Sequence, residues 1–341
     1  MNPLRDWNTF WFKPVSARPL GAFRILYGLT ALANLGLISV DFNLWYSGVG
    51  IVQGAEAREL AGPLRFSILQ YYQDPATAWA VYWGTAAVAV LFTLGWHTRI
   101  MGILLYLGTL TLYHRNIATN SGPDSLITIL SFYLMLSPCG AAYSLDALRA
   151  KQRRGGTVAE PLIAPWPQRL IQLQLCVIYF NTAVWKCTGY TWPNGTAVHY
   201  VLHNPEVGRL TLDPLSDYTI LISLMTHGAL VGEFLLAFFL WSRATRPYVI
   251  TLGVMLHVGI EFIVNAPLFG PLMMSCYILF LSIDEWDGAL RRLNPRRWFA
   301  RASAPRIPGR VDRPAALAGP HTRPRVVTRE AVESEDAALV P

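Results

Sequence analysis

Long apolar runs recur along this chain, and each is close to the ~20 residues that an α-helix needs to cross a bilayer. A series of such runs is typical of a polytopic membrane protein. We therefore expect an all-α fold, a transmembrane helical bundle with about eight spans. The expected spans cover residues 20–40, 78–94, 101–114, 124–136, 167–184, 218–241, 247–264 and 268–283.

The composition agrees with a membrane location. Hydrophobic residues make up 53% of the chain and charged residues only 14%, whereas a soluble domain carries about 25% charge. So few charges cannot cover a surface that faces water. The four cysteines are scattered with no CxxC pair. We therefore expect thiols that pack as small hydrophobic groups, and no metal site.

Three regions follow from the pattern of charge. We expect an interfacial N-terminal segment at 1–17, the transmembrane bundle at 18–287, and a basic, largely disordered cytoplasmic tail at 288–341. Positive charge gathers in alternate loops, which are expected to be cytoplasmic. The prediction is a multi-pass protein of the cell membrane with both termini in the cytoplasm. The cations expected on that side are Arg5, Lys13, Arg18, Arg99, Arg149, Lys151, Arg153, Arg154, Arg243, Arg246, Arg291, Arg292, Arg296 and Arg297.

Lys186 is the first candidate for a functional residue, because it lies at the non-cytoplasmic end of the fifth span. Nearly all other cations in the chain are Arg, which does not lose its proton in a protein. A Lys in an apolar pocket can act as a general base, and Trp185, Tyr179, Tyr190 and Trp192 are expected to supply such surroundings. The alternative is a Lys that anchors the helix end by extending its ammonium to the interface.

The seventh span carries His257, Glu261 and Asn265 at intervals of four residues, which places them on one helix face. Polar groups within a span are expected to face the bundle interior. A His and a Glu near Lys186 suit proton transfer, and interhelical hydrogen bonds that fix packing are the alternative. In the sixth span, Glu233 is expected to form a structural pair with a neighbouring helix.

Polar residues also crowd the connection between the third and fourth spans, where YHRN contains His114, Arg115 and Asn116. Arg115 is a candidate to bind an anion such as a carboxylate. The segment TWPNGTAVHY follows the fifth span and contains Trp192 and His199. This segment is expected to form a turn, after which the chain enters the apolar phase again near Lys186.

Several segments resemble the horizontally transferred transmembrane (HTTM) domain, the membrane part of vitamin K-dependent gamma-glutamyl carboxylase that many bacterial proteins share. They extend over residues 15–285 and occur in the expected order. The matching segments are FRILYG, LWYSGVGIV, GWHTRIMGILLY, YHRN…NSGPDSL…FYLMLSPCGAAYSLD, YFNTAVWK…W..GTAVHYVL and LHVGIEF.

The resemblance implies a carboxylase-like enzyme that uses a membrane quinol of the vitamin K type. A Lys of the carboxylases acts on the quinol, and Lys186 and His257 are the matching positions here. Lys186, His257 and His114 are thus the expected catalytic residues. Arg115, Asn116, Glu261, Trp192 and His199 are the expected substrate-binding residues.

A second function stays open, in which the bundle binds a lipid, a peptide or a partner protein without catalysis, for instance in toxin maturation or immunity. In both cases the expected partners are the lipid bilayer and a peptide or protein substrate, and no nucleic acid. A neutral Lys186 beside a quinone-sized pocket favours the enzyme. A protonated Lys186 in contact with water favours the binding protein.

Overall fold

A computed structural model describes residues 2–156, 160–209, 215 and 217–293, and the expected tail at 294–341 lies outside this part of the chain. The described residues are almost entirely helical, as the sequence predicts. Two short strands, β1 (Val15–Ser16) and β2 (Leu162–Ile163), form a small antiparallel pair. The helices are α1 (Pro3–Phe12), α2 (Arg18–Ile38), α3 (Phe42–Tyr46), α4 (Gly54–Ala61), η1 (Ile68–Gln70), α5 (Pro75–Leu94), α6 (Thr98–Arg115), η2 (Ile117–Thr119), α7 (Gly122–Leu136), α8 (Leu145–Arg153), α9 (Trp166–Thr188), α10 (Ala197–His203), α11 (Thr219–Phe239), α12 (Arg246–Ile263), α13 (Phe269–Cys276), η4 (Tyr277–Phe280) and α14 (Ile283–Leu293).

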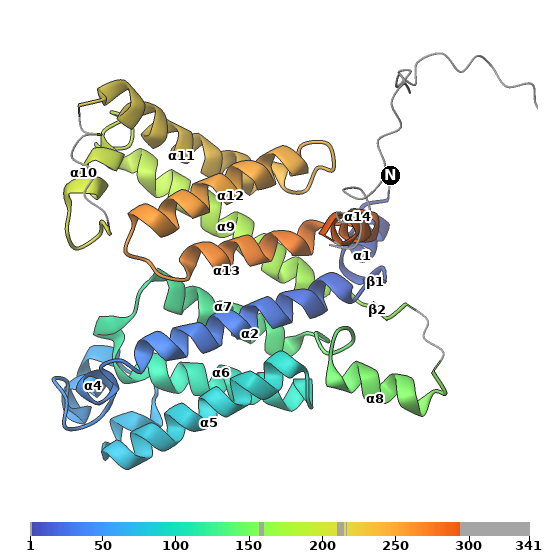
Figure 1. Ribbon diagram of the computed structural model, residues 1–341, viewed down its shortest axis with the longest axis horizontal. Coiled ribbons are helices and arrows are strands. Elements are labelled where there is room, and N and C mark those ends of the chain that lie inside the picture. Colours follow the sequence, from blue (N-terminus) through green and yellow to red (C-terminus); the bar gives the residue numbers. More distant parts are fainter. Residues whose placement is uncertain (1, 157–159, 210–214, 216, 294–341) are drawn as a thin grey trace, which may run out of the picture. The chain divides into compact units, whose positions relative to one another are not determined.

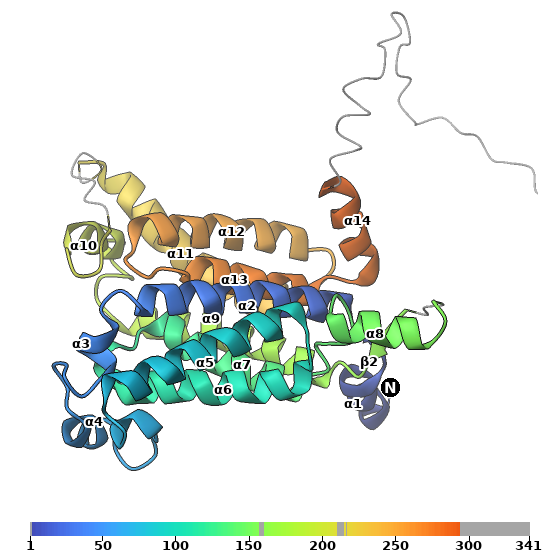
Figure 2. The same ribbon diagram turned by 60° about the horizontal axis from the view of Figure 1, so that its bottom comes forward.

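The apolar helices form a bundle in which each one packs against the next along the chain (Figures 1 and 2). Helices α2, α5, α6 and α7 make the first half, and α9, α11, α12 and α13 make the second. Contacts of α7 with α9 and of α13 with α2 join the halves and close the sequence of neighbours. Helices α1, α8 and α14 lie at the end of the bundle where the N-terminus is found, and α3, α4 and α10 lie at the other end (Figures 1 and 2).

Four helices, α2, α5, α11 and α12, are long and apolar enough to cross a membrane. Two further apolar helices are shorter, α7 and the segment Phe269–Phe280. Helices α6 and α9 have sufficient length but include polar and charged residues near their ends. The expected number of about eight spans therefore corresponds to eight packed helices, of which four meet the criteria for a span by themselves.

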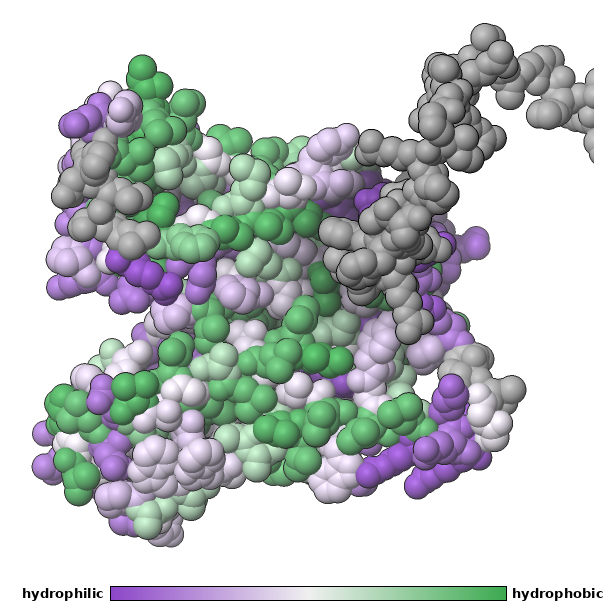
Figure 3. Space-filling view, viewed as in Figure 1, coloured by the Kyte–Doolittle hydropathy of each residue, from purple (hydrophilic) through white to green (hydrophobic). Residues whose placement is uncertain are grey.

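The surface of the bundle is apolar between its ends. Figure 3 shows hydrophobic residues across the middle of the visible face, with hydrophilic residues gathered around α8 and near α10. Large side chains such as Leu29, Trp83 and Met255 are exposed on this part of the protein. An exposed apolar surface of this extent is appropriate for contact with lipid.

The guanidinium group of Arg24 holds three helices of the first half together. Arg24 is fully buried on α2. Its Nη1 donates to the carbonyl of Cys139 at 2.9 Å, and its Nη2 donates to the carbonyls of Tyr143 at 2.6 Å and Thr93 at 3.4 Å. Thr93 is in the last turn of α5, and the other two follow α7. One side chain thus joins the end of α5 to the segment between α7 and α8.

Asp146 fixes the start of α6 at the same end of the bundle. Its carboxylate accepts from the backbone N–H groups of His97 at 2.9 Å and Thr98 at 2.8 Å. Burial raises the pKa of Asp146, but the hydrogen bonds from Thr98 and His97 outweigh burial, and the pKa lies below its usual value. Ser144 caps α8, because its hydroxyl oxygen accepts from the backbone N–H of Ala147 at 2.8 Å.

Replacing Arg24 should destabilise the bundle strongly. In Arg24→Met the buried carbonyls of Cys139 and Tyr143 lose their donor, so we expect the free energy of unfolding to fall by about 3 kcal/mol. Unfolding in mixed detergent micelles measures the change. Arg99→Met, at an exposed position of α6, is the control and should have little effect. Equal stability of the two variants would contradict this role of Arg24.

Candidate functional site

Lys186 and Glu233 form an ion pair between α9 and α11. The ammonium of Lys186 contacts the Oε1 atom of Glu233, and Thr182 donates to Oε2 at 3.2 Å. The side chain of Glu233 is 8% exposed and that of Lys186 is 23% exposed. The pair carries no net charge, and a neutral pair is less costly to hold in an apolar environment than one isolated ion. Glu233 thus pairs with a neighbouring helix as predicted, and its partner is the candidate base.

The aromatic surroundings of Lys186 differ from those expected. The ring of Trp192 lies 4.4 Å from the ammonium nitrogen, which is a cation–π contact. Trp185 and Tyr190, in contrast, are 69% and 81% exposed and point away from the bundle core. The expectation of an enclosing aromatic pocket was wrong in this respect, because a carboxylate and one indole ring provide the immediate contacts of Lys186.

A buried chain of hydrogen bonds lies next to this pair. The Nε2 atom of His257 on α12 is 2.6 Å from the hydroxyl of Tyr179 on α9, which is 2.5 Å from the hydroxyl of Tyr277 on η4. His257 is buried, and its Nδ1 atom has no partner in the described part of the protein. The prediction that His257 faces the interior and reaches the fifth span is therefore confirmed.

The other two residues of the predicted polar face have different positions. Glu261 accepts hydrogen bonds from the backbone N–H groups of Leu268 and Gly270, both at 3.1 Å, and so caps the start of α13. Asn265 is exposed and lies beyond the end of α12 at Ile263. The prediction that Asn265 faces the interior was wrong. Helix α12 ends at Ile263, so the spacing of four residues no longer places Asn265 on the same face as His257.

His114, Arg115 and Asn116 lie in the first half of the bundle and support the segment between α2 and α5. Buried Arg115 donates to the carbonyls of Ser47 at 3.0 Å and Val52 at 2.7 Å. Asn116 donates to the carbonyl of Trp45, and the Nδ1 atom of His114 is 3.1 Å from the carbonyl of Phe66. Among the described residues, no hydrogen bond or ion pair joins these three side chains to Lys186.

His199 is on α10, near Lys186 in the sequence but in another environment. Its imidazole packs against that of His203, with ring centroids 4.3 Å apart. It lines a cavity with Asn194 and Ser223 that Lys186 does not line. The structure therefore brings Lys186, Trp192 and His257 to one region and leaves His199 outside it.

A cavity of about 470 Å³ lies between α10, α11 and α12, and Lys186 and Trp192 line its polar part. The remaining lining is apolar and includes Gly228 and Gly259, where an added Cβ atom would meet open space. Phe269 belongs to the lining and also packs against the ring of His257, at 5.6 Å between centroids. The cavity thus connects the ion pair with the surroundings of His257.

Sequence reasoning did not identify this cavity. Its signal is the pair of glycines Gly228 and Gly232, four residues apart on α11, since small residues at this spacing let other groups approach a membrane helix closely. Among the described residues, no group of three metal-ligating side chains comes together. The polar groups that a ligand meets in the lining of this cavity are the ammonium of Lys186 and the indole of Trp192.

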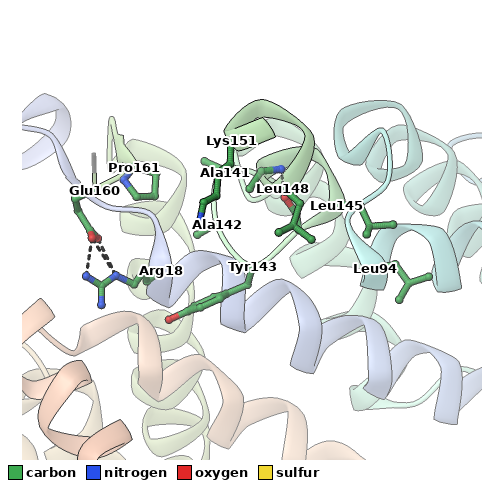
Figure 4. A pocket seen from close by; sticks show the side chains of 12 residues that line it. Arg18, Leu94, Ala141, Ala142, Tyr143, Leu145, Leu148, Lys151, Glu160 and Pro161 are labelled. Carbon is green, nitrogen blue, oxygen red and sulfur yellow. Dashed lines mark hydrogen bonds and ion pairs between the residues drawn. The ribbon is translucent and has the colours of Figure 1, made fainter. Parts of the chain in front are cut away.

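A different cavity, of about 620 Å³, opens at the end of the bundle near α8 (Figure 4). Arg18 lines it and is held by Glu160 at 2.5 Å and by Asp287 at 2.7 Å. Tyr143 and Leu148 form part of the wall (Figure 4). None of the expected site residues lines this cavity, so it is separate from the site at Lys186.

Comparison with known proteins identifies a domain family that covers the helical bundle. The HTTM domain profile matches residues 12–286, which include every helix of the two halves. The chain belongs to the HTTM domain family. As a member of this family with several apolar helices, it is a membrane protein.

Two relatives from Bacillus subtilis (strain 168) are similar to this HTTM protein. The sporulation-delaying protein SdpB is 22% identical over 274 residues, which are 76% of this chain and 79% of SdpB. The uncharacterized protein YitO is 27% identical over 130 residues, which are 37% of this chain and 40% of YitO. No solved structure matches the chain.

A double-mutant cycle should show coupling between Lys186 and Glu233. Glu233→Leu leaves the ammonium without its carboxylate, and we expect a loss of about 2 kcal/mol in the free energy of unfolding. Adding Lys186→Met should recover about 1–2 kcal/mol, because neither charge then remains unpaired. Unfolding in micelles of the wild type, both single variants and the double variant gives the coupling. Strictly additive effects would show that the two side chains do not interact.

Proposed function

We propose that this HTTM protein is a membrane enzyme that binds a lipid-soluble quinol and removes a proton from its hydroxyl group. The observation that carries the proposal is an apolar cavity between membrane helices, lined at its polar part by Lys186, whose ammonium pairs with Glu233. A cavity of this kind accepts a molecule with an apolar body and a polar head.

The residues present fit a quinol in size and chemistry. The volume of about 470 Å³ lies within the range of about 300–1,000 Å³ typical of ligand pockets. The side chains of Met225, Leu252 and Ile260 suit an apolar tail, and the indole of Trp192 suits a flat ring. When bound, the quinol would supply the reducing electrons of the reaction.

Lys186 and Glu233 together can accept the hydroxyl proton. A proton moves from the ammonium of Lys186 to the Oε1 atom of Glu233, which gives an amine and a carboxylic acid without a change in net charge. The free electron pair of the amine then accepts the hydroxyl proton, and Lys186 becomes an ammonium again. The hydrogen bond from Thr182 holds the carboxyl group in place throughout. A carboxylate partner thus allows a Lys to act as a base in an apolar site.

His257 is suited to a positioning role. Its ring is held by the bond to Tyr179, and Phe269 separates it from the cavity. Support for a carboxylase-like reaction, in which carbon dioxide is added to an acidic substrate, comes from the family resemblance around Lys186 and His257. The geometry itself supports the proton transfer.

The second candidate is a protein that binds a peptide or partner in the same cavity without catalysis. One observation favours it: Lys186 contacts both a carboxylate and an indole face, and both contacts stabilise a permanent ammonium. In this case Lys186 contributes charge alone.

Substitution of Lys186 separates the two candidates. Lys186→Arg keeps the charge but cannot act as a base. For the enzyme, we expect Lys186→Arg and Lys186→Ala to bind quinol and to lose at least about 100-fold in quinol oxidation, the lower range for loss of a general base. Lys151→Arg, on exposed α8, is the control. Full activity of Lys186→Arg would exclude Lys186 as a base.

The same assay tests the position of the ligand. In Gly228→Leu or Gly259→Leu, the added side chain would extend into the open cavity without striking the backbone. We therefore expect either variant to lose quinol binding and to keep its fold. Gly84→Leu on α5, where an added side chain also meets open space, is the matched control. Quinone identified by mass spectrometry in the purified protein reports binding. Retention of quinone by Gly259→Leu at the wild-type level would place it elsewhere.

We also propose that both termini are cytoplasmic and that Lys186 is at the non-cytoplasmic end of α9. The asymmetric distribution of Arg and Lys supports this orientation. A Cys at exposed Asn194 should react with an impermeant thiol reagent in intact cells, and a Cys at exposed Gln152 should react only after the cells are opened. Cys187→Ser removes the exposed native thiol. Reaction of both positions from one side would refute this topology.

A further inference from the structure

A third cavity, of about 710 Å³, has a lining that combines apolar side chains with several polar and cationic ones, and it lies at the end of the bundle that carries α1. It is formed by the segment after α1, the start of α9, the turn between α11 and α12, and the start of α14. Four cations line it: Lys13, Arg169, Arg243 and Arg246. The site proposed for the quinol is at the opposite end of α9, so this cavity needs a separate explanation.

The charges around this cavity do not balance. Arg246 pairs with Glu285 at 2.7 Å, and Glu160 is held by Arg18. In the described part of the chain, Lys13, Arg169 and Arg243 have no carboxylate partner. Asp284 is the remaining acidic group in the lining and is exposed. An excess of positive charge therefore faces the cavity, which favours an anionic ligand.

Arg169 is held in an orientation suited to such a ligand. Its guanidinium carbon lies 4.8 Å from the ring centroid of Phe10 and 5.7 Å from that of Trp241. Its Nη1 atom donates to Gln172 at 2.9 Å and its Nε atom to the carbonyl of Phe10 at 3.4 Å. Within the described residues, Nη2 donates to no protein group. A guanidinium fixed by aromatic rings with a free N–H edge is well arranged to bind a phosphate group.

Gln168 gives a second, independent indication of a ligand. It lines the same cavity and is only 6% exposed. Its amide nitrogen donates to the carbonyl of Leu279 at 2.6 Å, whereas its Oε1 atom has no partner among the described groups. A buried acceptor without a donor is costly. A ligand that offers a hydroxyl group next to its phosphate would satisfy it.

We propose that this cavity binds the headgroup of an anionic phospholipid with hydroxyl groups, of the phosphatidylglycerol type. Arg169 binds the phosphate, Lys13 and Arg243 surround it with positive charge, and Gln168 accepts a headgroup hydroxyl. Trp241 and the exposed aromatic residues Trp7 and Phe12 of α1 are appropriate for the bilayer interface. The cavity in Figure 4 does not offer the same chemistry, because its Arg18 already pairs with the carboxylates of Glu160 and Asp287.

Native mass spectrometry of the full chain, released from nanodiscs, tests the proposal. We expect phosphatidylglycerol to remain bound in preference to phosphatidylcholine. Lys13→Gln with Arg243→Gln should weaken the binding of phosphatidylglycerol roughly 25-fold, given about 1 kcal/mol for each cation near a lipid surface. Both side chains are exposed, so the fold should be kept. The matched control is Lys151→Gln with Arg153→Gln, which removes the same two residue types from exposed α8.

Two results would overturn the assignment. Equal weakening by both pairs of substitutions would indicate general attraction between the basic end of the protein and the membrane. Binding of soluble glycerol 1-phosphate as tightly as the lipid would show that the cavity takes a free phosphate ester instead of a lipid headgroup. The proposed site is supported if the control variant keeps its preference for phosphatidylglycerol and the variant with Lys13→Gln and Arg243→Gln loses it.

Discussion

Polar groups that are removed from water must find their partners within the protein, and this constraint explains most of the interior of the bundle. Arg24 is one case, because its two terminal nitrogens donate to carbonyls at the end of α5 and in the segment between α7 and α8. Arg115 does the same for the segment between α2 and α5. A cation surrounded by carbonyls needs no acidic partner and joins elements that are far apart in the sequence.

The two halves of the bundle use their polar residues differently. In the first half, Arg24 and Arg115 bind backbone carbonyls, and Asn34 bonds to the side chains of Asp124 and Tyr113. In the second half, Lys186 pairs with Glu233 and His257 bonds to Tyr179, and Lys186 also lines a cavity. The cavity beside an ion pair is what distinguishes the second half and makes it the location of the proposed site.

The sequence was sufficient to predict the helices, because apolar runs of this length have few other possible structures. It also placed His257 inside, since a His in the middle of a span avoids lipid. It could not identify the partner of Lys186, which is 47 residues away on another helix, and so suggested aromatic surroundings instead. For a similar reason the sequence could not show the backbone partners of Arg115. The carbonyls of Ser47 and Val52, to which its Nη2 atom donates, carry no side-chain signature.

The change from α13 to the 3-10 segment η4 determines the position of α9 along the bundle. At η4 the carbonyl of Leu279 is available, and the amides of both Gln168 and Gln172 donate to it at 2.6 Å. Further along the same two segments, Tyr179 bonds to Tyr277. A shift of α9 by one helical turn, about 5.4 Å, would break all three bonds together. The two glutamines thus fix the position of α9 along the bundle axis. Through the rigid helix they also fix the position of Lys186 at its other end.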